Sequence, residues 1–546
     1  MDCNDLCKMK ETLDANRDVF RGVWDDLLYY FMPEMQDSSM DRMTSSISEE
    51  LTPSDPTGSK SAEILSSGIF SNTITMQTEF FGFRTNNEEL NEVTEVKEWF
   101  TSASKECLRY MQNSNYQLMS SETIDYYVST CTGVFYTDWV GDGLFYKNFP
   151  IMRCSIAEDA NGLVDTIFRS FEMTAQQAYQ KWGEKNSSKI IEKYNDPEGR
   201  FEKFNFFHAV LPRDPKKVKK DTLIGEEMPY ASYYVDEENK TILEEGGYHE
   251  FPYAVPRFQH SPEHCFGKGA SMKALSVCRQ LDECREDLMD ARQHALQPTT
   301  WLPVGSTEGD VDNRPNAVNF FNPQSGIPIF QAPQVDQQAG MIEQQQAQQE
   351  VKEIFYVPLF TALSSADAKM TATQVNAIKS EKAQGLSPII NRLYDEFFSP
   401  SIERTLMLLM RNGKLKPMPE ALQGVEWSVE YKTRLDSMLE QIESNSNVEF
   451  FETAFNIKAM EAQAPDLSDI VDTDKMIRDM AIAKHVDMDI IRSEEETKKL
   501  REQKAIAMQQ QQQAEAMQNS IAPVDLSKAP EQGSAIQQAQ EQGAIL

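Results

Sequence analysis

The sequence predicts an α+β fold that is predominantly helical. Apolar residues recur at three- and four-residue steps over most of the chain, whereas the middle third alternates aromatic and β-branched residues between glycine-containing turns. Two long helical patterns also flank a proline-rich stretch. With 546 residues and 40% hydrophobic content, the chain is long enough for three or more core-bearing units.

The N-terminal part, residues 10–130, is expected to be mainly helical. Its first apolar side chains fall at helical spacing. They are Val19, Phe20, Val23, Leu27 and Phe31.

The middle third is expected to form a β-rich layer attached to the helical part. Cys131–Phe149 contains two aromatic runs flanking a Gly-Asp-Gly turn, which is a hairpin signal. A second hairpin is expected over Ile151–Phe171, turning at Asn161-Gly162. Further strand-like runs are Phe204–Val210, Tyr230–Val235 and Thr241–Leu243.

Two long helices with an excursion between them come next. An apolar stripe between Glu263 and Ala295 predicts a helix over Ala270–Gln297, roughly 40 Å long at 1.5 Å per residue. The proline-rich residues 298–333 predict an extended excursion with short strands. Asp336 then offers an N-cap for a helix to about Val357. We expect an antiparallel pair with the excursion at its tip.

A break at Pro358 is expected to open a flexible loop over residues 358–369, with small residues at Ser364 and Ser365. Beyond it, a helix starts at Met370 and runs through Leu409. Such an order of helix, loop and helix is suited to lining a hole.

The remaining C-terminal part is expected to be largely helical and acidic. Mild interruptions at Pro388 and Pro400 precede a helix end at Asn412-Gly413. Trp427–Leu435 resembles a short strand and turn. Residues from about Arg501 are low-complexity and glutamine-rich, a composition typical of disorder.

The formal net charge of -33 argues against one class of function. Tight or sequence-specific DNA binding depends on Lys and Arg neutralising phosphates, and 86 acidic against 53 basic residues repel nucleic acid at long range. The simplest interpretation is a solvated acidic surface. A nucleic-acid role fits this charge only in a conduit whose wall lets a polyanion slide.

The cellular setting is expected to be cytoplasm. The first residues carry acids where a secretory signal carries a basic stretch, and the longest aliphatic run, Leu406–Met410, is far too short to span a bilayer. The eight cysteines are scattered, which indicates reduced, mostly packed thiols rather than a disulfide framework.

Motifs for catalysis or cofactor binding are missing from the sequence. It has no phosphate loop ending in Gly-Lys-Ser/Thr, no Gly-x-Ser-x-Gly elbow and no His-Glu-x-x-His helix. His260, His264 and Cys265 are close together, but Pro262 breaks the regular spacing and no Cys-x-x-Cys partner exists, so packing or surface roles are favoured over a metal site. We therefore expect no cofactor.

Basic residues give two further hypotheses. Lys216, Lys217, Lys219 and Lys220 form the densest positive run, which indicates a solvated loop first and a phosphate contact second. Lys369, in the loop after Ser364 and Ser365, would form a ring of charges if many copies faced a common axis. Such a ring could contact phosphates weakly and reversibly.

Four short sequence words occur in a fixed order along the chain. They are Asp55-Pro56-Thr57-Gly58 with Ala62, Leu65 and Gly68; Arg169-Ser170-Phe171-Glu172-Met173-Thr174 with Gln177 and Trp182-Gly183; Phe266-Gly267-Lys268-Gly269; and Met370-Thr371-Ala372-Thr373-Gln374-Val375. In this order they resemble the portal proteins, or head-to-tail connectors, of short-tailed bacteriophages. The resemblance covers roughly residues 10–410.

The resemblance implies a dodecameric ring at one capsid vertex, through which double-stranded DNA enters during packaging and leaves during infection. It implies a ring subunit with an α/β wing, a two-helix stem, a small clip and a helical C-terminal crown. The corresponding ranges are 1–262 and 370–431 for the wing, 263–297 and 334–357 for the stem, 298–333 for the clip, 358–369 for the channel loop, 432–500 for the crown and 501–546 for a tail or barrel helix.

The implied partners are other copies of the chain, the large subunit of the terminase that powers packaging, the major capsid protein and tail adaptor proteins, without a membrane. The channel residues would be Ser364, Ser365 and Lys369. The clip residues expected to dock partners are Arg314, Asn316, Phe320, Phe321, Ile327 and Phe330.

Two alternatives remain open. An internal scaffolding or ejection protein would also use long helices and a glutamine-rich end. A metal-dependent nuclease would need carboxylate pairs as Mg²⁺ ligands, although such pairs arise by chance in a chain with 86 acidic residues. The candidate pairs are Asp472 with Asp474 and Asp487 with Asp489.

Overall fold

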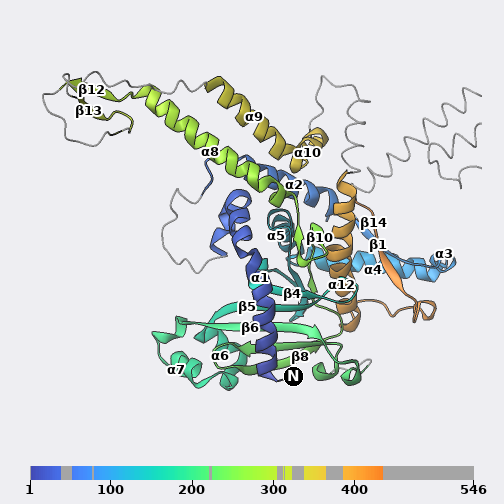
Figure 1. Cartoon of the computed structure of the whole chain (residues 1–546). Helices are drawn as coiled ribbons and strands as arrows, with labels where there is room; N and C mark the ends of the chain where they lie inside the picture. The colour runs from blue at the N-terminus through green and yellow to red at the C-terminus, as the bar shows by residue number, and fades with distance from the viewer. Residues whose placement is uncertain are drawn as a thin grey trace, which may run out of the picture. The chain divides into compact units, whose positions relative to one another are not determined.

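The computed structural model describes residues 2–38, 52–76, 79–219, 224–303, 312, 314–321, 337–364 and 385–433. They all belong to one compact unit, Met1–Leu439, and the second unit, Glu440–Leu546, lies outside the described residues. The first unit mixes helices and strands in one chain, which confirms the predicted α+β class (Figure 1).

Four helices dominate the N-terminal part, as expected. They are α1 (Cys3–Phe31), α2 (Thr57–Thr73), α4 (Thr94–Gln112) and α5 (Tyr116–Ser129), with a single turn, α3 (Glu88–Asn91), before α4.

The buried face of α1 agrees with the predicted one at Phe20, Leu27 and Phe31 but not at the two valines. Trp24 is fully buried together with Phe20 and Leu27, whereas Val19 is 74% exposed and Val23 is also exposed. One residue along a helix turns the side chain by about 100°. The valines lie one position before the stripe that begins at Phe20 and continues at Trp24, so they face away from the core.

A strand that the helical pattern does not predict interrupts this region. β1 (Phe81–Thr85) pairs antiparallel with β14 (Trp427–Tyr431), near the far end of the described chain. The strand expected at Trp427 is therefore confirmed, but its partner lies in a region expected to be helical.

Both expected hairpins are present. β2 (Phe135–Val140) pairs with β3 (Gly143–Asn148), and β4 (Cys154–Glu158) pairs with β5 (Val164–Thr174). The turns need glycine, because Gly141 has a φ of 62° and Gly162 a φ of 81°. β2 also pairs with the short β9 (Tyr253–Ala254).

The middle third of the sequence forms a five-stranded antiparallel sheet. Its order is β4-β5-β6-β7-β8, with β6 (Lys203–Pro212), β7 (Tyr230–Asp236) and β8 (Thr241–Tyr248). Phe206 packs with α6 (Ala175–Trp182) and α7 (Ser188–Asn195), while the next residue, Phe207, packs with the start of α1. Alternate side chains of a strand point to opposite faces, so the sheet is covered on both sides.

The long helix α8 (Ala270–Leu296) confirms the expected helix almost to the residue. A small hairpin, β10 (Gln259–Ser261) with β11 (His264–Lys268), precedes it, so the first residues of the range 263–297 form a strand. Beyond α8, β12 (Thr300–Pro303) and β13 (Val318–Phe321) form a separate two-stranded sheet.

The chain then returns through α9 (Gln337–Ile354) and α10 (Val357–Ser364). Residues 385–393 are helical and continue through a π-helical turn, Tyr394–Phe398, into α12 (Ser399–Arg411). Gly413, with a φ of 64°, closes α12 as predicted. Pro400 lies directly after the π-helical turn, and such a turn is a common way for a continuous helix to accommodate a residue that lacks a backbone N–H.

Two compositional expectations can be compared with the structure. All eight cysteines are free, and five of them are buried, as expected for mostly packed thiols: Cys7, Cys107, Cys131, Cys154 and Cys278. None of the helices in the described ranges combines the length and apolarity needed to cross a bilayer.

Candidate functional site

The candidate site is the pair of helices α8 and α9 with the structures at its two ends. Gln280 on α8 donates a hydrogen bond to Glu343 on α9 over 3.2 Å, and Leu288 contacts Gly340. Because residue numbers rise along one helix as they fall along the other, the pair is antiparallel, as the sequence predicts. Figure 1 shows α8 running from the core of the unit to the β12–β13 sheet.

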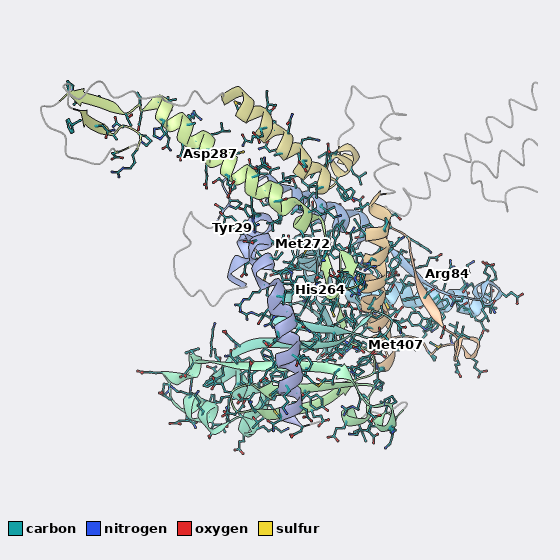
Figure 2. The ribbon with its side chains drawn as sticks, viewed as in Figure 1. Tyr29, Arg84, His264, Met272, Asp287 and Met407 are labelled. Atoms are coloured by element: carbon teal, nitrogen blue, oxygen red, sulfur yellow. The ribbon has the colours of Figure 1, made fainter. Side chains whose placement is uncertain are left out.

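The inner and outer halves of α8 differ in burial. Ala274, Cys278 and Leu281 are buried in the core, whereas Leu288 and Ala291 of the predicted stripe are only half-buried and Ala295 is exposed. Figure 2 labels Met272 on the inner half and Asp287 on the outer half. The apolar stripe predicted along the whole helix is therefore covered by the core only at its inner end.

Asp55 joins the inner end of this helix pair to α2. One carboxylate oxygen accepts the backbone N–H of Thr57 over 2.9 Å and so satisfies the start of α2. The other accepts Gln348 over 2.9 Å and Gln344 over 3.3 Å, both from α9, and lies 3.5 Å from Arg285 of α8. Asp55 is only 5% exposed, so these groups replace its water.

Hydrogen bonding controls the charge state of Asp55. Burial alone would raise the pKa of this carboxyl, but hydrogen bonds from Thr57, Gln348 and Gln344 favour the carboxylate and lower its pKa from the usual value. A second carboxylate, Asp282 on α8, accepts the backbone N–H groups of Ser54 and Asp55. The inner end of the helix pair is thus held by charge-assisted hydrogen bonds.

Close packing at two glycines explains why helix α2 fits against these elements. A Cβ on Gly58 would lie 3.0 Å from the sulfur of Cys278 on α8, and a Cβ on Gly68 would lie 2.4 Å from the ring of Phe360 on α10. The first word of the family resemblance, from Asp55 to Gly68, therefore marks the contact surface between α2 and the helices α8, α9 and α10.

The break after α9 lies earlier than predicted. Tyr356, with a φ of 55°, separates α9 from α10, and Pro358 is the second residue of α10. Proline is tolerated in the first turn of a helix, so its presence marked a helix start rather than a loop. The described part of the expected loop, residues 358–364, is helical.

The far end of the helix pair carries the β12–β13 sheet, in which the two strands run parallel. Asn316, with a φ of 62°, donates its N–H to the carbonyl of Gln297 over 2.9 Å, which anchors the sheet to the end of α8. An isolated sheet of two strands is only marginally stable in water. Among the described residues, no third strand pairs with the outer edge of β12 or β13, so the backbone groups on these edges can pair with another chain.

Apolar side chains face solvent on this sheet. Phe320 is 54%, Val318 49% and Leu302 43% exposed. Arg314 is also exposed and binds Asp312, which in turn hydrogen-bonds with Asn319. An exposed apolar surface with unpaired strand edges is typical of a protein-binding site.

The predicted site residues fall into two groups. Arg314, Asn316, Phe320 and Phe321 gather on or beside β13, and Ser364 ends α10. Ser365, Lys369, Ile327 and Phe330 lie outside the described residues, as do Asp472, Asp474, Asp487 and Asp489.

The predicted histidine and cysteine cluster has packing contacts. His264 packs edge-on against Phe20 with ring centroids 5.0 Å apart, and His260 lies 3.3 Å from Glu158. Within the ranges that the structure describes, no group of three His, Cys, Asp or Glu residues is arranged to hold a metal ion.

An important residue that the sequence analysis missed is Arg257, which is 2% exposed. Its guanidinium binds Glu396 over 2.7 Å, the carbonyl of Gly162 over 2.8 Å and the carboxylate of Glu158. Its backbone N–H also donates to Glu396 over 2.8 Å. This buried network ties the sheet strands to the π-helical turn before α12.

Replacing Asp55 with alanine is expected to destabilise the unit by about 2–3 kcal/mol, because the helix cap is lost and the amides of Gln344 and Gln348 lose their acceptor. Asp55→Asn, which keeps an acceptor for Thr57, should cost less. Thermal unfolding of the purified variants measures both effects. An unfolding temperature of Asp55→Ala equal to that of the unaltered chain would refute this role.

Comparison with known proteins gives consistent matches over nearly the whole chain. The family model for the bacteriophage head to tail connecting protein matches residues 4–491. A probable portal protein of Bordetella phage BPP-1 is 25% identical over 514 residues, covering 92% of this chain and 91% of that protein. The portal protein of Salmonella phage epsilon15 is 25% identical over 529 residues, covering 94% and 92%.

Proposed function

This chain belongs to the family of bacteriophage head-to-tail connecting proteins, and we propose that it forms the portal ring of a capsid, the conduit for genome packaging and ejection. The family assignment confirms the resemblance found in the sequence. The observation that supports the proposal best is the antiparallel pair α8–α9, with its inner end fixed by Asp55 and an exposed sheet at its outer end.

The parts of the ring are assigned as follows. The pair α8–α9 is the stem, and the β12–β13 sheet belongs to the clip. The channel loop comprises residues 358–369, of which the described residues 358–364 are helical. In this assignment Ser364, Ser365 and Lys369 face the opening. The wing comprises residues 1–262 and 370–431, residues 432–500 form the crown, and residues 501–546 form a tail or barrel helix.

A ring of twelve copies is the proposed assembly. When one chain repeats head to tail, each copy uses two different surfaces, and the ring closes once the rotation between copies completes a circle. The acidic composition suits such a conduit. A wall with excess negative charge repels phosphate from every side, so the duplex stays centred and mobile rather than bound.

The proposed partners contact different parts of the ring. The terminase large subunit docks on the clip during packaging, and tail adaptor proteins replace it afterwards. The major capsid protein surrounds the wing. The docking residues are Arg314, Asn316, Phe320, Phe321, Ile327 and Phe330. Among these six, Phe320 is the apolar side chain that the structure shows to be exposed.

We expect Phe320→Asp to leave the ring intact and to weaken terminase binding at least tenfold, or about 1.4 kcal/mol, because a carboxylate cannot fill an apolar contact. Binding of the purified terminase large subunit to the ring measures this effect. Leu118→Asp, on α5 at a site that is 61% exposed, is the matched control. Equal affinities of both variants would exclude Phe320 from the docking surface.

We expect Lys369→Glu to leave ring assembly intact and to shorten or destabilise the packaged genome, because it replaces a ring of phosphate contacts by repulsion. Lys369→Arg keeps the charge and should behave normally. The length and retention of DNA in purified particles measure the effect. Unchanged packaging and retention with Lys369→Glu would show that this lysine does not contact DNA.

The proposed role is structural and not enzymatic. Labelling the chain in assembled phage particles tests this role, since a portal occupies one vertex while an internal scaffold spreads through the particle or leaves it. Incubation of the purified chain with duplex DNA and Mg²⁺ tests the nuclease alternative. Cleavage abolished by alanine at Asp472, Asp474, Asp487 and Asp489 would overturn the structural role.

A further inference from the structure

A recess between β3, β5 and α6 gathers positive charge on a chain that is otherwise strongly acidic. It has a volume of about 600 Å³, and Lys147, Arg169 and Lys181 contribute to its wall together with Gln177 and Gln180. None of the three cations forms an ion pair with a carboxylate of the described residues. We call this recess the cationic pocket.

Aromatic rings fix the central cation of the pocket. The guanidinium of Arg169 lies between Phe149 and Phe171, at 4.2 and 4.4 Å from the two ring centroids. Its Nε is buried and has no hydrogen-bond partner. Stacking on both faces holds a guanidinium in one orientation. The hydroxyl of Tyr253 takes up part of the in-plane hydrogen-bonding capacity of Arg169, and the N–H groups that remain suit a carboxylate.

The two lysines are also oriented by rings. Lys181 lies 3.7 Å from the ring centroid of Tyr234, and Lys147 lies 5.3 Å from that of Phe149. Burial and then the nearby Arg169 lower the pKa of Lys147. Burial also lowers the pKa of Lys181, and Arg169 adds to this effect although Glu244 opposes it. Burial is thus the main cause of the lowered pKa at both lysines, and the positive charge of Arg169 adds to it, although Glu244 outweighs Arg169 at Lys181.

The acidic groups near the cationic pocket have other partners. Glu172 is part of its wall, but its carboxylate pairs with Lys203 over 3.1 Å. Glu244 accepts a hydrogen bond from the indole of Trp182 over 3.0 Å. The pocket therefore keeps a net positive charge that a ligand with a carboxylate would neutralise.

We propose that the cationic pocket binds a carboxylate-rich segment of the adjacent copy in the ring, namely α3 and the start of α4. This inference rests on the proposed ring. The segment presents exposed glutamates without an ion pair among the described residues, and Figure 1 shows α3 and α6 on opposite sides of the unit. The exposed carboxylates are Glu88, Glu89, Glu92, Glu95 and Glu98.

A ring that closes head to tail requires the two complementary surfaces to lie on opposite sides of each copy. Each copy then offers the cationic pocket to one neighbour and the acidic segment to the other. Copies with a net charge of -33 repel one another, so a local pairing of opposite charges sets their register. A recess also suits single side chains better than duplex DNA, which presents its phosphates on a convex surface.

The test is a charge swap on the full chain. The double variant Lys147→Glu with Lys181→Glu changes two exposed residues of the cationic pocket and leaves Arg169 in place. The complementary variant is Glu88→Lys with Glu89→Lys and Glu92→Lys. Native mass spectrometry at 150 mM and lower salt measures the fraction of chain in rings, and circular dichroism confirms folding.

Each separate variant should lower the fraction in rings at least tenfold at about 150 mM salt, and combining the two should restore it. The control is Lys216→Glu with Lys217→Glu, which makes the same charge change at two exposed lysines outside the pocket and should leave the rings intact. Loss of rings in the Glu88, Glu89 and Glu92 variant is a result that general repulsion cannot produce, because this variant lowers the net negative charge of the chain.

Three outcomes would overturn the inference. The first is a fraction in rings that is equal for the Lys147 and Lys181 variant and the control, and the second is a combined variant that fails to restore assembly. Intact rings that no longer package DNA would assign the cationic pocket to a phosphate-bearing ligand instead. A monomeric unaltered chain would contradict the proposed function itself, so the two failures are distinguishable.

Discussion

Replacing Arg257 with methionine is expected to lower the free energy of unfolding by about 3–5 kcal/mol, the usual cost of removing one partner from a buried ionic network. The carboxylates of Glu396 and Glu158 are 11% and 16% exposed, so each would lose its closest cationic partner in a poorly solvated site. The longer contacts of Arg392 with Glu396, at 3.7 Å, and of His260 with Glu158, at 3.3 Å, would remain. The backbone N–H of Arg257 would still bind Glu396, but the guanidinium hydrogen bonds would be lost.

Thermal unfolding of the purified chain measures this effect, and the unfolding temperature should fall by about 5 °C or more. Arg84→Met is the matched control, because Arg84 is 56% exposed and pairs with Glu430 over 3.4 Å. An exposed pair contributes less than about 1 kcal/mol. Equal shifts for the two variants would show that the Arg257 network does not stabilise the unit.

A second experiment separates lost charge pairing from lost packing. If uncompensated charge causes the instability, Arg257→Met combined with Glu396→Gln and Glu158→Gln should recover part of the lost free energy. If the triple variant is instead less stable than Arg257→Met alone, the loss comes from packing and hydrogen bonding.

Gly267→Ala is expected to be the most disruptive small substitution near the base of α8. A Cβ at this position would lie 2.2 Å from the carbonyl oxygen of Cys131, and that oxygen accepts the N–H of Phe258 over 3.0 Å. Backbone atoms held by a hydrogen bond cannot move aside as a flexible side chain can. We expect a loss of about 2–3 kcal/mol and a reduced yield of assembled rings.

Gly22→Ala provides the control for this prediction. Gly22 lies within α1 and a Cβ there would meet nothing within 4 Å, so alanine should stabilise the helix by up to about 1 kcal/mol. The unfolding temperature and the assembled mass of both variants measure the contrast. A Gly267→Ala chain that is as stable as the Gly22→Ala chain would rule out the close contact at Cys131.

The elements predicted correctly are those with strong local signals. The hairpin turns at Gly141 and Gly162 require positive φ, which glycine supplies, and the alternating residues around them need no distant information. Helix α8 has an apolar stripe and ends immediately before Pro298. Glycine in the turns, the spacing of apolar residues and the position of proline were therefore sufficient to predict these elements.

The elements missed depend on distant contacts. β1 becomes a strand because β14 pairs with it from the other end of the described chain, and no local pattern reveals such a partner. Pro358 suggested a break, but in the fold it begins α10, since proline suits the first turn of a helix as well as a loop.

The candidate site was predicted in outline and not in its chemistry. The words of the family resemblance located Asp55 and Arg169, but only the structure shows that Asp55 binds Gln344 and Gln348 and that Arg169 lies between two phenylalanines. Arg257 has no local signature, because a single arginine in a loop gains its role from carboxylates far away in the sequence.

The central claim is that many copies of this chain surround an open axis. The most direct measurement is the mass of the purified assembly in solution, combined with electron microscopy along its axis. The account predicts particles near 750 kDa, which is twelve copies of 62.3 kDa, with an opening at the centre. Particles of 62.3 kDa without an opening would contradict it.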